Sequence, residues 1–146
     1  MKTNKRIDEL VNEIGKEEIL NYLNNANRFL TYTDIKSYND ACEYLEVSDE
    51  DKIYNTDSKY IKGLKKLVHV YKAINKLNNW TPDFTDSNQK KWYPYFKVSS
   101  GIACSHTRYD YDFTYSTVGV RLCTYSENVA IYIGKTFTTE YEDFLL

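Results

Sequence analysis

The sequence predicts an α+β protein, in which N-terminal helices and one long amphipathic helix pack with a small antiparallel sheet of about three strands and a C-terminal helix. Apolar residues recur at intervals of three and four in the first half of the chain, alternate after Trp80, and recur at helical spacing again after Ser126. The 146 residues are enough for a single domain over 1–146. We expect its helical part at about 1–79, and its sheet and C-terminal helix at about 90–146.

Short helices are expected at the beginning of the chain. Residues 5–14 and 16–25 both show helical spacing of apolar residues, and Gly15 separates the two segments. Ser37 is a favourable N-cap for a third helix, in which Asp40 takes the third position.

The clearest helix follows Ser58 and extends to about residue 79. Gly63 costs this helix about 1 kcal/mol relative to Ala, which its apolar stripe can compensate. The stripe consists of Ile61, Leu64, Leu67, Val68, Tyr71, Ile74 and Leu77.

After Trp80, apolar residues recur at every second position, as in a β-strand. In residues 92–98, Trp92, Phe96 and Val98 alternate with Tyr93, Tyr95 and Lys97, and Pro94 indicates an edge strand or a bulge. Residues 102–106 and 117–125 are two further expected strands, and 107–116 between them is expected to be a hairpin tip or a wide loop. Ser126 can cap a last helix that extends to about Phe144.

Charge divides the chain into three segments. The net charge is −2, but residues 1–57 sum to −6, residues 58–108 to +8 and residues 109–146 to −4. Six lysines and no acid lie between Ser58 and Pro82. Such asymmetry indicates either an anionic partner or an acidic surface of the same molecule that neutralises the basic segment.

Cysteine usage indicates reduced thiols and therefore a cytoplasmic location. Cys42, Cys104 and Cys123 are odd in number and form no CxxC pair, and the N-terminal residues lack the apolar run of a secretory signal. No stretch approaches the 18 or so apolar residues that a membrane span needs, so we expect no membrane partner.

Two stretches carry a resemblance to a known family. Residues 71–96, YKAINKLNNWTPDFTDSNQKKWYPYF, and 118–145, VGVRLCTYSENVAIYIGKTFTTEYEDFL, resemble an uncharacterised family of small proteins from Bacteroides-type gut bacteria, their mobile elements and crAss-like phages. The family usually has Gly before the Trp, where this chain has Asn79, and often a second Trp in place of Phe84. The resemblance implies a phage or mobile-element origin, the host cytoplasm and a small α+β domain. It implies no activity.

Residue types that carry chemistry are sparse. The only histidines, His69 and His106, lie far apart, and with the cysteines they lack the paired spacing of a zinc site, so we expect neither a metal nor a cofactor. Cys104 and His106 are about 7 Å apart along a strand, too far for a hydrogen-bonded nucleophile and base.

Carboxylates offer two weak alternatives. Asp110 and Asp112 could act as an acid and base pair in a small hydrolase, or simply belong to a solvated loop. Asp83, Asp86 and Lys90 faintly resemble a metal-dependent nuclease pattern, but they fall in a segment that is typical of a turn. A non-enzymatic role is therefore favoured.

The basic and aromatic middle segment is the candidate site. Its rings and cations could form a stacking platform for a phosphate-bearing ligand, either single-stranded nucleic acid or a nucleotide. The two Trp rings could equally be core, and the same composition suits an interface with a host protein, as in an anti-defence factor, or a homo-oligomer. The candidate ligand-binding residues are Lys62, Lys66, Trp80, Lys90, Lys91, Trp92, Tyr93, Tyr95, Lys97 and Arg108.

Overall fold

A computed structural model describes residues 15, 18, 20, 23, 28–48, 53–98, 102–110 and 122–146, and for 98 and 102–110 it describes the backbone alone. Two compact units are present, Met1–Leu30 and Thr31–Leu146. The helices expected over 5–14 and 16–25 lie outside the described residues, except for three helical positions at 18, 20 and 23. The expectation of a single domain over 1–146 stays a prediction.

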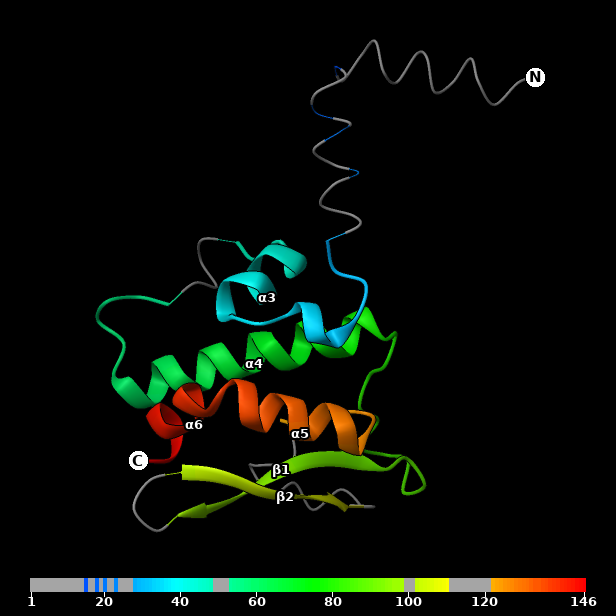
Figure 1. Ribbon diagram of the computed structural model, residues 1–146, viewed down its shortest axis with the longest axis vertical. Helices are drawn as coiled ribbons and strands as arrows, with labels where there is room; N and C mark the ends of the chain where they lie inside the picture. The colour runs from blue at the N-terminus through cyan, green and yellow to red at the C-terminus, as the bar shows by residue number, and fades with distance from the viewer. Residues whose placement is uncertain are drawn as a thin grey trace, which may run out of the picture. The chain divides into compact units, whose positions relative to one another are not determined.

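The unit Thr31–Leu146 contains all the elements that follow (Figure 1). Its helices and strands are, in chain order, the 3-10 helix η1 (Tyr32–Asp34), α3 (Tyr38–Leu45), α4 (Lys59–Leu77), β1 (Lys91–Val98), β2 (Ile102–Asp110), α5 (Glu127–Thr136) and α6 (Thr138–Leu145). Figure 1 shows α4 between α3 on one side and the α5–α6 pair on the other, with the two strands beyond α5.

The core lies between these layers. Almost completely buried apolar side chains include Leu67, Val70 and Ile74 of α4, Val129 and Ile133 of α5, and Phe137 between α5 and α6. Polar contacts join the layers as well, because the hydroxyls of Tyr71 and Tyr141 lie 2.7 Å apart in the interior between α4 and α6. The long amphipathic helix and the helical C-terminal region of the sequence prediction are thus confirmed.

Helix N-caps are formed by the predicted serines. Ser58 Oγ accepts from the backbone N–H of Ile61 at the start of α4, and Ser126 Oγ accepts from Val129 at the start of α5. Ser37 Oγ accepts from the N–H of Asp40, whose carboxylate in turn receives the Ser37 hydroxyl. Each helix therefore begins where a side-chain oxygen satisfies an N–H that has no partner inside the helix.

The two strands form an antiparallel sheet in the order β1–β2, with Trp92 opposite Tyr109 and Val98 opposite Ile102. The register shifts between Tyr95 and Phe96, as expected for a bulge close to a strand proline. Strand β2 extends to residue 110, so part of the expected loop over 107–116 is strand.

A third strand is not found among the described residues. Of the stretch 117–125, residues 117–121 lie outside them, and the rest contributes an isolated antiparallel bridge between Thr124 and Trp92. Thr124 exchanges two backbone hydrogen bonds with Trp92, at 2.8 and 2.9 Å, before the chain turns into the N-cap of α5. The prediction of about three strands therefore has no support.

The sequence predicted one continuous C-terminal helix, but the structure has two. The break is at Phe137, which is buried and separates α5 from α6. Thr138 Oγ1 donates to the carbonyls of Gly134 and Lys135 at 3.1 Å, and this side-chain bonding competes with the helical ladder. The break lets α6 turn onto α4 while α5 stays on the sheet.

Candidate ligand groove

An open groove of about 930 Å³ lies along the C-terminal half of α4. One wall is the helix itself, and the other is the loop that follows it. The residues that line the groove are Val68, Tyr71, Lys72, Asn75, Lys76, Asn79, Trp80, Thr81, Pro82, Phe84 and Leu122.

The end of α4 places Trp80 in this groove. Asn79 has φ 50°, its N–H donates to Lys76 O, and the N–H of Trp80 donates to Asn75 O at 2.9 Å. These two bonds are a Schellman motif, which requires a left-handed residue at the position of Asn79. Asn is the residue that adopts this conformation most readily after Gly. Asn79 therefore forms a tight turn at this position without glycine.

The loop wall is held by side chains that bond to its own backbone. Gln89 accepts from the N–H of Asp83 at 2.7 Å and donates to Thr81 O at 3.0 Å, which spans the loop. Asp83 Oδ1 accepts from both the N–H and the hydroxyl of Thr85, and these bonds lower the pKa of the Asp83 carboxyl. The wall is thus formed before any ligand arrives.

Lys91 supports the same loop from inside. Its side chain is fully buried, its Nζ donates to the carbonyls of Asp86 and Gln89, and it lies 5.7 Å from the centre of the Phe84 ring. The prediction that Lys91 belongs to an exposed binding surface is therefore wrong. Its two carbonyl bonds satisfy an ammonium that would otherwise be costly to bury.

The polar groups at the base of the groove are already engaged. Asn75 Nδ2 donates to Cys123 O at 2.9 Å, and Asn75 Oδ1 accepts from Thr124 Oγ1 at 2.8 Å. The Tyr71 hydroxyl is bonded to Tyr141. Burial raises the pKa of the neighbouring Cys123 thiol to about 11, so this thiol stays protonated near neutral pH. A ligand would meet rings, aliphatic groups and cations here.

The charge of the groove is positive. Lys72 and Lys76, one helical turn apart, are both exposed, and none of its described lining residues is an acid. Lys76 Nζ lies 5.6 Å from the centre of the Tyr44 ring of α3. The described polar contacts include no ion pair of either lysine with a carboxylate, so both ammonium groups can face an anionic ligand.

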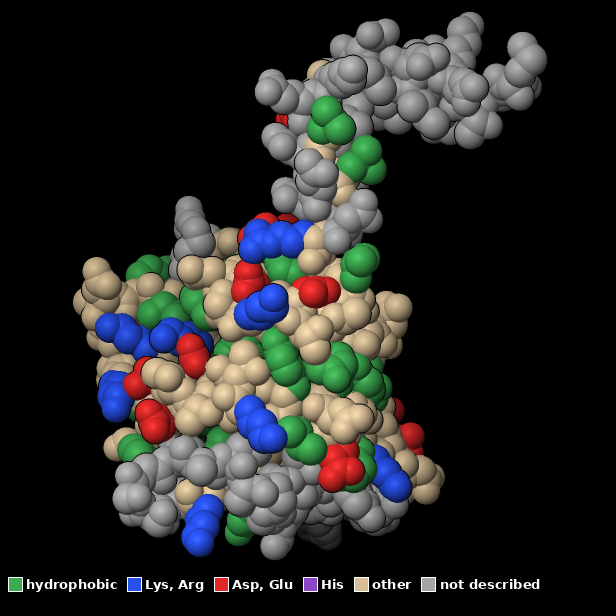
Figure 2. Space-filling view, in the orientation of Figure 1, with side chains coloured by type: hydrophobic (Ala, Val, Ile, Leu, Met, Phe, Trp, Pro, Cys, Tyr) green, Lys and Arg blue, Asp and Glu red, His purple; other side chains and the backbone are tan. Residues whose placement is uncertain are grey.

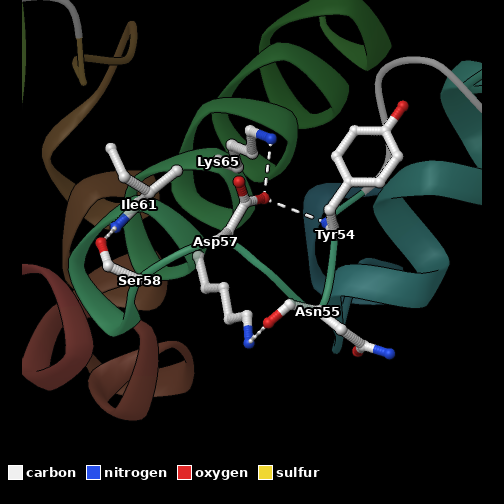
Figure 3. A network of polar contacts seen from close by, with 7 residues as sticks. Tyr54, Asn55, Asp57, Ser58, Ile61 and Lys65 are labelled. Carbon is white, nitrogen blue, oxygen red and sulfur yellow. Dashed lines mark hydrogen bonds and ion pairs between the residues drawn. The ribbon is translucent and has the colours of Figure 1, made fainter.

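The lysines in the N-terminal half of α4 are arranged differently. Lys62 Nζ donates to Asn55 O at 3.2 Å, and Lys66 Nζ lies 4.0 Å from Glu140 of α6. Lys65 Nζ lies 2.7 Å from the Asp57 carboxylate, which also accepts from the N–H of Tyr54 (Figure 3). The hydrogen bond from Lys65, followed by the one from Tyr54, lowers the pKa of Asp57.

Lys62 and Lys66 are therefore engaged within the molecule and do not line the groove. The sequence analysis left open an alternative in which acidic residues of the same molecule neutralise the basic segment. Among the described residues, the carboxylates that pair with α4 come from Asp57 and from Glu140 and Asp143 of α6.

The predicted strand residues do not join Trp80 in the groove. Tyr95 and Lys97 are exposed, Trp92 and Tyr93 are half-buried, and Lys90 is exposed in the loop before β1. The backbone of Arg108 pairs with Tyr93, and its side chain is outside the description. On the face of the unit Thr31–Leu146 shown in Figure 2, the described Lys and Arg side chains are scattered and form no continuous basic patch.

The described residues offer no obvious catalytic centre. They contain no group of three or more His, Cys, Asp or Glu side chains that could hold a metal ion. The carboxylates of Asp83 and Asp86 bond to the N–H groups of their own loop, as is usual for turns. Asp112 and the side chains of Cys104, His106 and Asp110 lie outside the description, so a hydrolase built on these residues stays a prediction.

The most important residues that the sequence analysis missed are Lys72 and Lys76. A signal was present in the sequence, because Lys72, Lys76 and Trp80 are spaced by four residues and so follow one side of a helix and its end. Phe84 and Leu122 gave no comparable signal, since only the tertiary fold brings them to this helix.

Comparison of the chain with protein-family models, with curated proteins and with solved structures finds no match. In the part of the chain that the structure describes, none of the helices has the length and apolar character needed to cross a membrane.

Proposed function

We propose that this protein is a non-enzymatic binding module for a phosphate-bearing ligand, single-stranded nucleic acid or a nucleotide, and that the ligand occupies the groove beside α4. The observation that carries the proposal is the combination of Lys72, Lys76 and the half-buried Trp80 in one groove without a described acid. Ammonium groups attract phosphates, and an indole ring offers a stacking surface for a base.

The proposed binding site is this groove, and it differs from the set of candidate residues that the sequence analysis named. Trp80 belongs to both, whereas Lys91 is internal and Lys62 and Lys66 are bonded elsewhere. In line with the family resemblance, we infer a phage or mobile-element accessory protein in the host cytoplasm. The thiols of its three cysteines would stay reduced there.

Fluorescence anisotropy tests this proposal with a labelled dT oligonucleotide and a labelled nucleotide, each titrated at several salt concentrations. The double variant K72Q/K76Q should bind at least tenfold more weakly than the wild type at low salt. Lys59→Gln is the matched control, because Lys59 is on the same helix but outside the groove and pairs with Asp143. Absence of salt-dependent binding in the wild type, or an equal loss in K59Q, would contradict the proposal.

A protein-interaction role is the second candidate, and one surface favours it. Tyr60 at the start of α4, Leu145 at the end of α6 and the following Leu146 are exposed apolar side chains. The rings of Tyr60 and Phe144 lie 5.2 Å apart beside them. Aromatic and aliphatic side chains of this kind are typical of interface cores. Light scattering over a range of concentrations tests self-association, and the variant L145S/L146S should abolish any dimer that forms through this surface.

A further inference from the structure

The geometry points to a short single strand as the ligand of the groove, held by two neighbouring phosphates and one stacked base, in preference to a mononucleotide. We draw this inference on the basis of the function proposed above. It specifies which phosphate-bearing ligand the groove accepts, and in which order its parts would lie along α4.

The lysine spacing gives the first argument. Lys72 and Lys76 are separated by four helical residues, which is about 6 Å along the axis of α4. A stacked strand advances about 3.4 Å per phosphate and an extended strand advances further, so an unstacked strand can present one phosphate to each lysine. Adjacent phosphates of a nucleoside triphosphate are joined through single bridging oxygens, so they are closer together than this axial spacing.

The position of Trp80 gives the second argument. It follows the last turn of α4 and its half-buried ring lines the groove, so it lies beyond Lys76 in the direction that leads away from Lys72. The Schellman motif fixes its backbone, which limits the freedom that the ring would lose on binding. A strand that crosses both lysines would then bring its next base to the indole.

The length of the groove gives the third argument. Its helical wall extends from Val68 to Lys76, about 12 Å along the axis, before Asn79 and Trp80 complete it. This length exceeds what one nucleotide needs and suits two to three nucleotides. Because the amide of Asn75 and the hydroxyl of Tyr71 are already bonded, phosphate contacts and stacking would supply most of the affinity, with little reading of base edges.

A length series tests the inference. Thymidine 5′-monophosphate and single strands of two, three and six dT nucleotides are titrated into the full chain. The variant W92F is used so that Trp80 is the sole tryptophan reporter. Affinity should rise at least tenfold from the monophosphate to dT3 and change less than threefold from dT3 to dT6, with quenching of Trp80 fluorescence. The slope of log K against log salt should be about −1.4 for dT3, from two contacts at about 0.7 each.

Variants separate the contributions. K72Q and K76Q should each reduce the salt slope by about 0.7, and K59Q should leave it unchanged. W80F lacks the Trp80 reporter and is measured by the anisotropy of labelled dT3; it should retain most of the affinity because a phenyl ring still stacks. Equal affinity for the monophosphate and dT3 would overturn this inference while the proposed function stands. Failure of all four ligands to bind would overturn both.

Discussion

At Gly63, the backbones of α4 and α6 are in close contact. A methyl group at this position would lie 2.8 Å from both Glu140 O and Phe144 N, which are backbone atoms that cannot move without a shift of α6. The sequence analysis counted this glycine as a cost to the helix of about 1 kcal/mol. The structure shows that this cost permits close contact with α6, where the ring pair Tyr60–Phe144 and the buried Tyr141 also pack.

Gly63→Ala should therefore lower the free energy of unfolding by about 1 to 3 kcal/mol, although Ala favours helix formation. Urea denaturation followed by circular dichroism measures the change. Lys66→Ala is the control, since it faces the same helix and removes only a 4.0 Å ion pair, so its effect should stay below about 0.5 kcal/mol. A stabilised G63A variant would contradict the close packing of α4 and α6.

Asp57 is a residue whose titration should affect stability. Its carboxylate accepts from Lys65 and from the N–H of Tyr54, and these bonds lower its pKa below the ordinary value near 3.8. A carboxyl with a lowered folded-state pKa adds stability above its unfolded-state pKa, and this stability is lost as the pH falls through the folded-state value. The contribution should therefore be complete at neutral pH.

Asp57→Asn should destabilise the protein at pH 7, and the difference from the wild type should shrink as the pH falls from about 4 towards 2. Thermal unfolding at a series of pH values measures this difference. Asp143→Asn is the comparison, because Asp143 pairs at 3.6 Å with a Lys59 side chain that is mostly exposed and should contribute little. A D57N penalty that persists unchanged to pH 2 would contradict the role of the carboxylate charge.

At the scale of elements, the end of α4 determines where the groove ends. The left-handed φ of Asn79 allows the N–H of Trp80 to reach Asn75 O and directs the chain into the loop wall. The preceding residue, Asn78, has an ordinary φ of −103° and donates its side-chain amide to Ile74 O. The two adjacent asparagines thus have φ angles of opposite sign.

Substitution by glycine should change the free energy of unfolding in opposite directions at these two positions. Asn79→Gly should raise the free energy of unfolding by up to about 1 kcal/mol, because glycine adopts positive φ without steric cost. Asn78→Gly should lower it by about 1 kcal/mol, because it loses a hydrogen bond and adds backbone entropy to the unfolded state. Urea denaturation measures both, and a loss of stability in N79G would contradict the Schellman motif.

Elements with a strong local signal were predictable. The apolar stripe of α4 and the serine caps of three helices depend on residues close in sequence, so the pattern alone determines them. The break at Phe137 was not, because apolar spacing continues through it, while the backbone of Phe137 leaves the helical conformation and Thr138 bonds back to the end of α5. The extra strand was predicted from alternation over 117–125; of this stretch the structure describes 122–125, where Thr124 forms an isolated bridge to Trp92.

The candidate site was predicted only in part, because its lysines differ in their contacts and these are not visible in the sequence. Composition identified the basic and aromatic segment, but it could not show which of its lysines bond within the molecule. Lys91 and Lys72 have the same charge in the sequence, whereas one is fully buried against backbone carbonyls and the other is exposed in the groove. Lys91 bonds to carbonyls only two and five residues earlier, so the difference depends on the conformation of this loop, which the residue types alone do not reveal.

At the scale of the whole unit, a few buried polar groups connect layers that are far apart in sequence. Asn75 of α4 bonds to Cys123 O and to Thr124, and Thr124 exchanges two backbone hydrogen bonds with Trp92 of β1. Across the same interior, the hydroxyl pair Tyr71–Tyr141 joins α4 to α6. Helices and strands should therefore unfold together.

Asn75→Ala should lower the free energy of unfolding by about 2 to 4 kcal/mol, because it leaves the Cys123 carbonyl and the Thr124 hydroxyl buried without their partner. Asn78→Ala, one turn away and losing a single part-buried bond, should cost about 1 kcal/mol or less. Urea unfolding of both variants is followed by tryptophan fluorescence, which reports on the groove and β1, and by circular dichroism, which reports on the helices. If Asn75 couples the layers, the two signals coincide in the wild type and in N78A, and in N75A the fluorescence change comes at lower urea concentration. Equal effects of the two substitutions would show that Asn75 contributes no more than an ordinary hydrogen bond.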